Sequence, residues 1–296
     1  MRTGNKIWVG IGAFVVAGTG AVGASGPAPQ SATTNASSTS LAELLNRTSI
    51  PQSPARGFVI AQHAKHGGEG GEGEGGEKGA AAKLPPDLGF ALRIAQMRGH
   101  LLVGDQLVKE GQWAAALPHF LHPVEELYGG VRKQLKDYKT PPFEAALKLL
   151  SNVVKRKKGG EDYDKAFKAV EDALAAADAG LKEKQKNWQG FSVETALELL
   201  KSSTGEYEEA IVKGRIAKPV EYQDARGFVW QAEKMIEIVA SGLEKKDAEA
   251  FKHVRDALAD LKKAFPTAMP PKAPVKDHGA VLSDVSRIEL AAGRLM

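Results

Sequence analysis

The stretch SVETALELL at residues 192–200 decides the fold class. Its apolar side chains recur at intervals of three and four residues, which places them on one face of a helix with polar residues opposite. An earlier segment repeats the pattern. The residues at this spacing are Val193, Ala196, Leu197 and Leu200, and earlier Leu147, Leu150 and Val154. A helix with one apolar face must bury that face against another element, so this pattern predicts packed amphipathic helices.

The same pattern continues through the chain from Asp87 onward, and helix-breaking glycines and prolines separate the periodic segments. Because the connections are short, neighbouring helices should run antiparallel. The sequence therefore predicts an all-α, antiparallel up-and-down bundle of about seven to eight helices, without a strand. The expected helices span residues 87–110, 112–137, 142–158, 161–184, 192–213, 219–241, 245–264 and 281–293.

Composition excludes several classes of protein. The chain has 296 residues, of which 43% are hydrophobic, so it has enough apolar material for a substantial core. A net charge of only +4 argues against a polybasic nucleic-acid binder. The chain has no cysteine, which excludes disulfides, thiolate metal sites and cysteine nucleophiles.

The first 24 residues have the pattern of a secretory signal peptide. Arg2 and Lys6 precede an apolar run at residues 7–16, and small residues at 22–24 form a cleavage site before Ser25. A cleaved signal is favoured over an uncleaved anchor, because the run is short and rich in glycine. We therefore expect a periplasmic or otherwise exported protein with no stable membrane span after signal cleavage.

Three further regions follow the signal. Residues 25–86 are rich in Ser, Thr, Gly and Glu and predict a disordered linker, because they hold almost no apolar side chain to bury. Residues 87–265 should form the helical bundle domain. Residues 266–296 should form a proline-rich connection and a C-terminal helix.

The segment HFLHPVEELY at residues 119–128 is the strongest candidate for chemistry. His122 lies three residues before Glu125 and four before Glu126, and both spacings place an imidazole next to a carboxylate on a helix surface. This pair of donors suits iron, manganese, zinc or copper. Pro123 cannot donate to the carbonyl of His119, so the helix should be distorted locally.

The preceding helix carries Met97 and His100 at the same three-residue spacing. If the two helices form an antiparallel hairpin that turns at Gly111, His100 lies level with His122, and Met97 lies level with Glu125. Four candidate ligands would then converge at one level of the bundle. The alternative is that these histidines are satisfied core residues and that Met97 only fills space.

A second polar group consists of the runs EYEE at residues 206–209 and EYQD at 221–224. Their carboxylates could serve hard ions, but such runs are more often solvated helix faces. The chain has no G-x-S-x-G, HExxH, P-loop or dinucleotide-binding motif. The sequence therefore gives no reason to expect an enzyme.

The segment LLKSSTGEYEEAIVKGRIAKPVEYQDARGF at residues 199–228 resembles the helical periplasmic domains that accompany bacterial iron permeases. The pair of His122 and Glu125 is also similar to the H-x-x-E motif of imelysin-like periplasmic proteins. The resemblance covers at most residues 87–265 and implies a secreted metal-binding bundle that assists uptake or sensing. Two features depart from these families: Phe120 stands where the imelysin pattern has glycine, and the R-E-x-x-E motif of the permease is absent.

The sequence thus favours an exported bundle that binds a transition metal ion, with iron favoured over copper, and that works with a membrane permease or another envelope protein. The candidate ligands are His122, Glu125, His100, Met97, His119 and Glu126. The alternative is a periplasmic helical scaffold for protein–protein interaction without metal. A redox enzyme at the same site is the least favoured reading.

Overall fold

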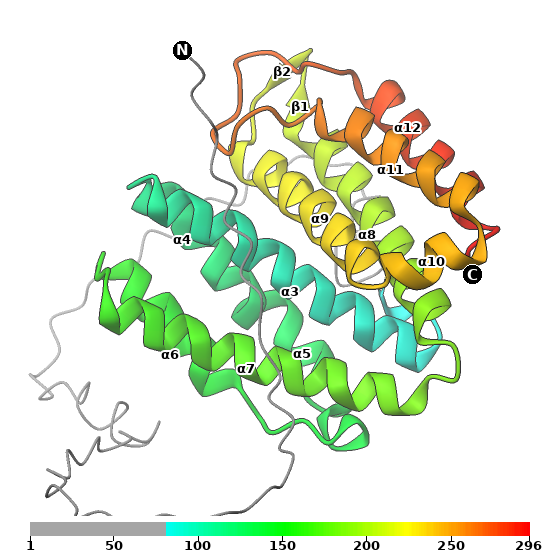
Figure 1. Cartoon of the computed structure of the whole chain (residues 1–296). Coiled ribbons are helices and arrows are strands. Elements are labelled where there is room, and N and C mark those ends of the chain that lie inside the picture. The colour runs from blue at the N-terminus through cyan, green and yellow to red at the C-terminus, as the bar shows by residue number, and fades with distance from the viewer. Residues whose placement is uncertain (1–80) are drawn as a thin grey trace, which may run out of the picture. The chain divides into compact units, whose positions relative to one another are not determined.

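The computed structural model describes residues 81–296 (Figure 1). The signal segment and nearly all of the expected linker lie outside the described residues. Ala81 is buried and belongs to the hydrophobic core, so the fold begins a few residues before Asp87, where the sequence analysis placed its start.

The first group of helices comprises α3 (Pro86–Lys109), α4 (Trp113–His122), α5 (Tyr128–Val131), α6 (Glu144–Lys155) and α7 (Glu161–Lys184), with a π-helical turn η1 (Pro123–Leu127) and a 3₁₀ turn η2 (Leu135–Tyr138). Helices α3 and α4 form a hairpin at Gly111, whose φ of 75° favours glycine. In the structure, the region that was expected to form one helix over residues 112–137 consists of four short elements, which are α4, η1, α5 and η2. Pro123, which lacks an N–H group, begins the π-helical turn and explains the first break.

The second group comprises α8 (Trp188–Ala210), α9 (Pro219–Ile238), α10 (Ala240–Lys246), α11 (Ala248–Lys262) and α12 (His278–Ala292). Helices α8, α9, α11 and α12 share one hydrophobic core, and α12 packs on α11 and α8 (Figure 1). The prediction of an all-helical antiparallel bundle is confirmed.

One detail of that prediction is wrong. The helix expected over residues 192–213 ends at Ala210, and a small hairpin follows, formed by β1 (Ile211–Val212) and β2 (Arg215–Ile216). Lys213 and Gly214 both have positive φ, at 53° and 72°, which is the conformation of a two-residue hairpin turn and cannot continue a helix.

Helices α3 and α9 cross at a pair of glycines. A Cβ atom on Gly227 would lie 2.3 Å from the carbonyl oxygen of Gly99, and one on Gly99 would lie 2.5 Å from the ring of Phe228. Only glycine at these two positions allows the helix backbones to come so close. The crossing joins the two groups of helices and brings His100 on α3 beside Asp224 on α9.

Among residues 81–296, no helix has both the length and the apolar character that crossing a bilayer requires.

Candidate metal centre

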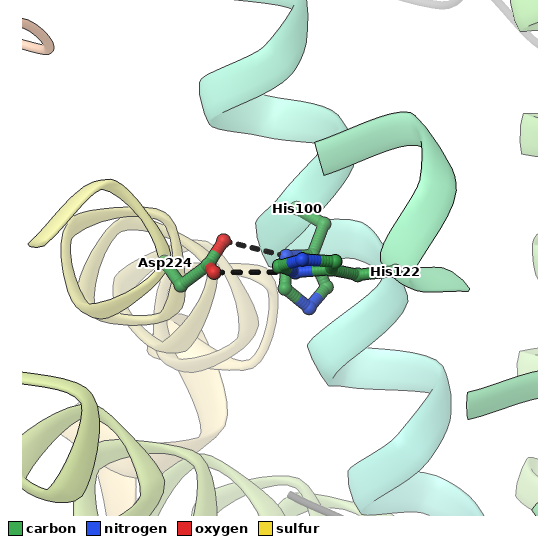
Figure 2. Close-up of side chains that lie close together, drawn as sticks. All are labelled: His100, His122 and Asp224. Atoms are coloured by element: carbon green, nitrogen blue, oxygen red, sulfur yellow. Dashed lines mark hydrogen bonds and ion pairs between the residues drawn. The ribbon is translucent and has the colours of Figure 1, made fainter. Parts of the chain in front are cut away.

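Three histidines surround the carboxylate of Asp224. Figure 2 shows two of them, His100 and His122, beside this carboxylate. Oδ1 of Asp224 lies 2.7 Å from Nδ1 of His100 and 2.7 Å from Nδ1 of His119. Oδ2 lies 3.3 Å from Nδ1 of His122. Three separate elements supply these side chains: α3 carries His100, α4 carries His119 and His122, and α9 carries Asp224.

The α3–α4 hairpin brings His100 and His122 together. Their rings lie 5.1 Å apart, centroid to centroid, as expected for positions equally far from a turn at Gly111. Gly104 helps, because a Cβ atom there would lie 2.8 Å from the ring of Phe120 and would push α4 away. The hairpin geometry inferred from the sequence therefore places the two imidazoles correctly.

The charge of Asp224 depends on these neighbours. Asp224, His100 and His119 are almost fully buried. Burial raises the pKa of a carboxyl group, but the charges and hydrogen bonds of His100 and His119 outweigh this effect and hold the pKa of Asp224 well below its usual value. The group is therefore a carboxylate at neutral pH.

His122 lies at the edge of the group, with 23% of its side chain exposed. Burial lowers its pKa, whereas the hydrogen bond and charge of Asp224 raise it, and the nearby carboxylate of Glu126 also raises it. The net result is a pKa above the usual value. Because His122 contacts the buried carboxylate of Asp224 and is itself partly exposed, it connects the centre to solvent.

His119 has a partner on each side of its ring. Nδ1 faces Asp224, and Nε2 lies 2.9 Å from Oε1 of Gln223. Because both nitrogens face acceptor oxygens, His119 holds the carboxylate in place and has no nitrogen left for a metal ion. The side chains whose ligand atoms lie within 4.8 Å of one another are instead His100, His122 and Asp224.

Asp224 also belongs to a second group, with Glu206 on α8 and Glu221 on α9. Their ligand atoms likewise lie within 4.8 Å of one another. Burial, followed by the charge of Asp224, raises the pKa of Glu221. The two polar clusters that the sequence offered separately thus meet at one carboxylate.

The remaining predicted ligands lie elsewhere. Met97 is fully buried and forms part of the hydrophobic core, and Glu125 is exposed to solvent. Among the described residues, Glu125 belongs to neither group of His and carboxylate side chains with metal-binding geometry. The π-helical turn that starts at Pro123 changes the register after His122, so a regular i, i+3 relation between His122 and Glu125 no longer holds.

Asp224 was absent from the predicted ligand set, although its acidic run was noticed. Its partners lie about a hundred residues earlier in the chain, at His119 and His100, so no local spacing could reveal them. A signal was present: the dipeptides Arg98-Gly99 and Arg226-Gly227 put a glycine inside each of two helices. A glycine inside a helix costs stability and commonly marks a close helix approach.

A comparison with models of known protein families gives a match for part of the chain. Residues 182–296 match the model of the iron permease-associated 4-helix bundle domain. These residues contain α8, α9, α11 and α12, the four helices that share one core. The match supports the iron-permease-associated part of the resemblance, not specifically the imelysin-like part, and it extends past residue 265 to the end of the chain. Neither the curated proteins nor the solved structures include a significant match.

Proposed function

We propose that this protein binds a transition metal ion, with iron favoured over copper, and that it serves iron uptake, sensing or storage. The observation that carries the proposal is the convergence of His100, His122 and Asp224, whose ligand atoms lie within 4.8 Å of one another. In this role, the metal is cargo, and the three side chains hold it.

The chemistry of the donors supports a borderline metal ion. Two imidazoles and a carboxylate suit Fe(II), Mn, Zn or Cu(II), and the carboxylates of Glu206 and Glu221 add hard oxygen donors close to Asp224. The thioether of Met97, which would favour Cu(I), is fully buried among the core residues. The carboxylate oxygens, which are hard donors, favour iron over copper.

The carboxylate is also prepared for a cation. Asp224 is already ionised, and its hydrogen bonds to His100 and His119 fix its orientation. An incoming metal ion replaces protons at the imidazole nitrogens rather than ordering a loose site. His119 acts as the supporting partner that orients the ligand carboxylate, with Gln223 behind it.

The proposed location rests on the signal pattern, and the proposed partner is supported by the matched segment. We propose that the signal pattern at residues 1–24 exports the protein and that it then acts beside a membrane permease or another envelope protein. The matched description, iron permease-associated, supports this partner. A permease would receive the ion that the His–Asp centre captures.

The test is metal analysis and calorimetric titration of the full mature chain with Fe(II), kept anaerobic, and with Cu(II). We expect about one Fe(II) per chain, and an affinity at least 100-fold lower in His122→Ala, since losing an orienting partner alone costs about 10–100-fold. Glu125→Ala should leave the affinity unchanged, because that side chain is exposed. His253→Ala is the matched control, because this histidine is 60% exposed and lies outside the cluster.

Two results would contradict the proposal. One is the absence of bound Fe(II) after reconstitution of the native chain. The other is an equal affinity in His122→Ala and in His253→Ala. Either result would leave the histidines and Asp224 as a structural network and would favour the scaffold function instead.

A further inference from the structure

A cavity that opens to the surface lies apart from the His–Asp centre. It has a volume of about 340 Å³ and is lined by residues of α3, α7, α8 and α9. None of the metal-centre side chains lines it. Its size falls at the lower end of the range for small-molecule sites in proteins, about 300–1,000 Å³.

The walls of this cavity are mostly apolar. Trp188 and Phe191 stand on α8 with ring centroids 6.0 Å apart, and Met235 and Ile238 face them from α9. Ile94 on α3 contributes a further aliphatic surface. Ile238 is 78% exposed, so this apolar wall reaches the protein surface. Such a lining binds the hydrocarbon part of a ligand.

One polar side chain in the cavity lacks a protein partner. Gln231 is only 6% exposed and lines the cavity, and within residues 81–296 its amide makes no hydrogen bond. The amide atoms themselves are accessible at the cavity, because the fully buried side-chain atoms without a partner in residues 81–296 are Oε1 of Gln96 and Nε of Arg226. A ligand group that displaces water from this amide loses affinity unless it replaces the hydrogen bonds of that water. A ligand with a polar head group would satisfy the amide.

The charges favour an anionic head group. Arg98 pairs with Asp178 at 2.5 Å, and these two groups are neutral together. Lys234 also lines the cavity, and it forms no ion pair with any other residue of the described chain. The net charge at the cavity is therefore positive. Gln231 and Lys234 lie three residues apart on α9, on neighbouring positions of one helix face.

We propose that this cavity binds a small amphipathic anion, with an alkyl or aryl body and one carboxylate. The body lies between Trp188, Phe191 and Met235, and the carboxylate accepts hydrogen bonds from Gln231 and Lys234. A charge-assisted hydrogen bond to the lysine gives the carboxylate an advantage over an uncharged hydroxyl. This site is independent of the proposed metal centre.

Octanoate and octan-1-ol test the proposal, because they share an alkyl chain and differ in head group. Calorimetric titration of the full chain should show saturable binding of one octanoate, at least tenfold tighter than octan-1-ol. Lys234→Gln should weaken octanoate about tenfold and leave octan-1-ol unchanged. Gln231→Leu should weaken octanoate and strengthen octan-1-ol.

Lys155→Gln is the matched control, because Lys155 is exposed on α6 and does not line the cavity. It should bind octanoate like the native chain, and so should His122→Ala, which separates this site from the metal centre. Urea unfolding of each variant checks that it is folded. Equal affinity for octanoate and octan-1-ol, no saturable binding at millimolar octanoate, or no effect of Lys234→Gln would overturn the proposal.

Discussion

Replacing Gly227 by alanine tests whether the α3–α9 crossing positions the metal centre. The new Cβ atom would lie 2.3 Å from the carbonyl oxygen of Gly99, whereas ordinary contacts begin at 3.4 Å. The obstacle is backbone, so no side chain can rotate away. The helices must separate by about 1 Å to relieve the overlap.

Such a separation would also move Asp224 away from His100, because Asp224 lies one helical turn before Gly227 on α9. The distance from Nδ1 of His100 to Oδ1 of Asp224 is 2.7 Å, and it would grow to about 3.7 Å, beyond the range of a hydrogen bond.

The cost in stability has three parts. Overpacking costs about 1–3 kcal/mol, and a lost hydrogen bond to a charged group costs about 1.5–3 kcal/mol. The better helix propensity of alanine returns about 1 kcal/mol. We therefore expect Gly227→Ala to lower the free energy of unfolding by about 1.5–5 kcal/mol.

Urea unfolding followed by circular dichroism at 222 nm measures this change, and Fe(II) titration measures the effect on the centre. Gly205→Ala is the matched control, because Gly205 is exposed inside α8 and its new Cβ would meet no atom within 4 Å. That variant should be more stable by about 1 kcal/mol. If Gly227→Ala were as stable as Gly205→Ala, the close crossing would not exist, and the account of how His100 meets Asp224 would fail.

Three further predictions concern single side chains. Asp224→Asn should destabilise the metal-free protein by about 3–5 kcal/mol at pH 7, because it removes the charged partner of two buried imidazoles. Since the folded-state pKa of Asp224 is lowered, its contribution is present above the unfolded pKa and is lost as the pH falls through the folded-state pKa. In urea unfolding, the difference in unfolding free energy between the two proteins should therefore be smaller at pH 3 than at pH 7. Tyr207→Phe should lower the free energy of unfolding in urea by about 0.5–1.5 kcal/mol, because the buried hydroxyl donates a hydrogen bond to the carbonyl of Lys276 at 2.7 Å. Burial raises the pKa of Tyr207 to about 12. In the ultraviolet titration of tyrosine, the variant should therefore lose only absorbance that rises near this high pH. Gly214→Ala should cost about 1–2 kcal/mol in thermal unfolding, because its φ of 72° strains an alanine.

The sequence predicted the helices and the local hairpin well, for a physical reason. Periodicity of three to four residues reports a helix directly, and Gly111 marks the turn between two consecutive helices. His100 and His122 lie the same number of residues before and after that turn, so an antiparallel hairpin places them side by side. These relations are local, so the chain itself specifies them without reference to distant segments.

Distant relations were not accessible in this way. Asp224 reaches the histidines because α9 packs on α3, and that packing depends on Gly99 and Gly227 rather than on any motif around the ligands. The position of Glu125 was misjudged for a different reason. A regular helix was assumed after His122, whereas Pro123 starts a π-helical turn, and the sequence does not say how far a helix turns at such a point.

The centre joins two parts of the chain that have different relationships to known proteins. Asp224, Glu206 and Glu221 lie inside the segment that matches the iron permease-associated domain, whereas His100 and His122 lie outside it. At this centre, the matched segment thus contributes only carboxylates, which suit hard cations. The α3–α4 hairpin adds imidazoles next to the same carboxylate, and imidazoles shift the preference of a site toward transition metals. Under the proposed function, the hairpin would therefore set the ion preference of the centre.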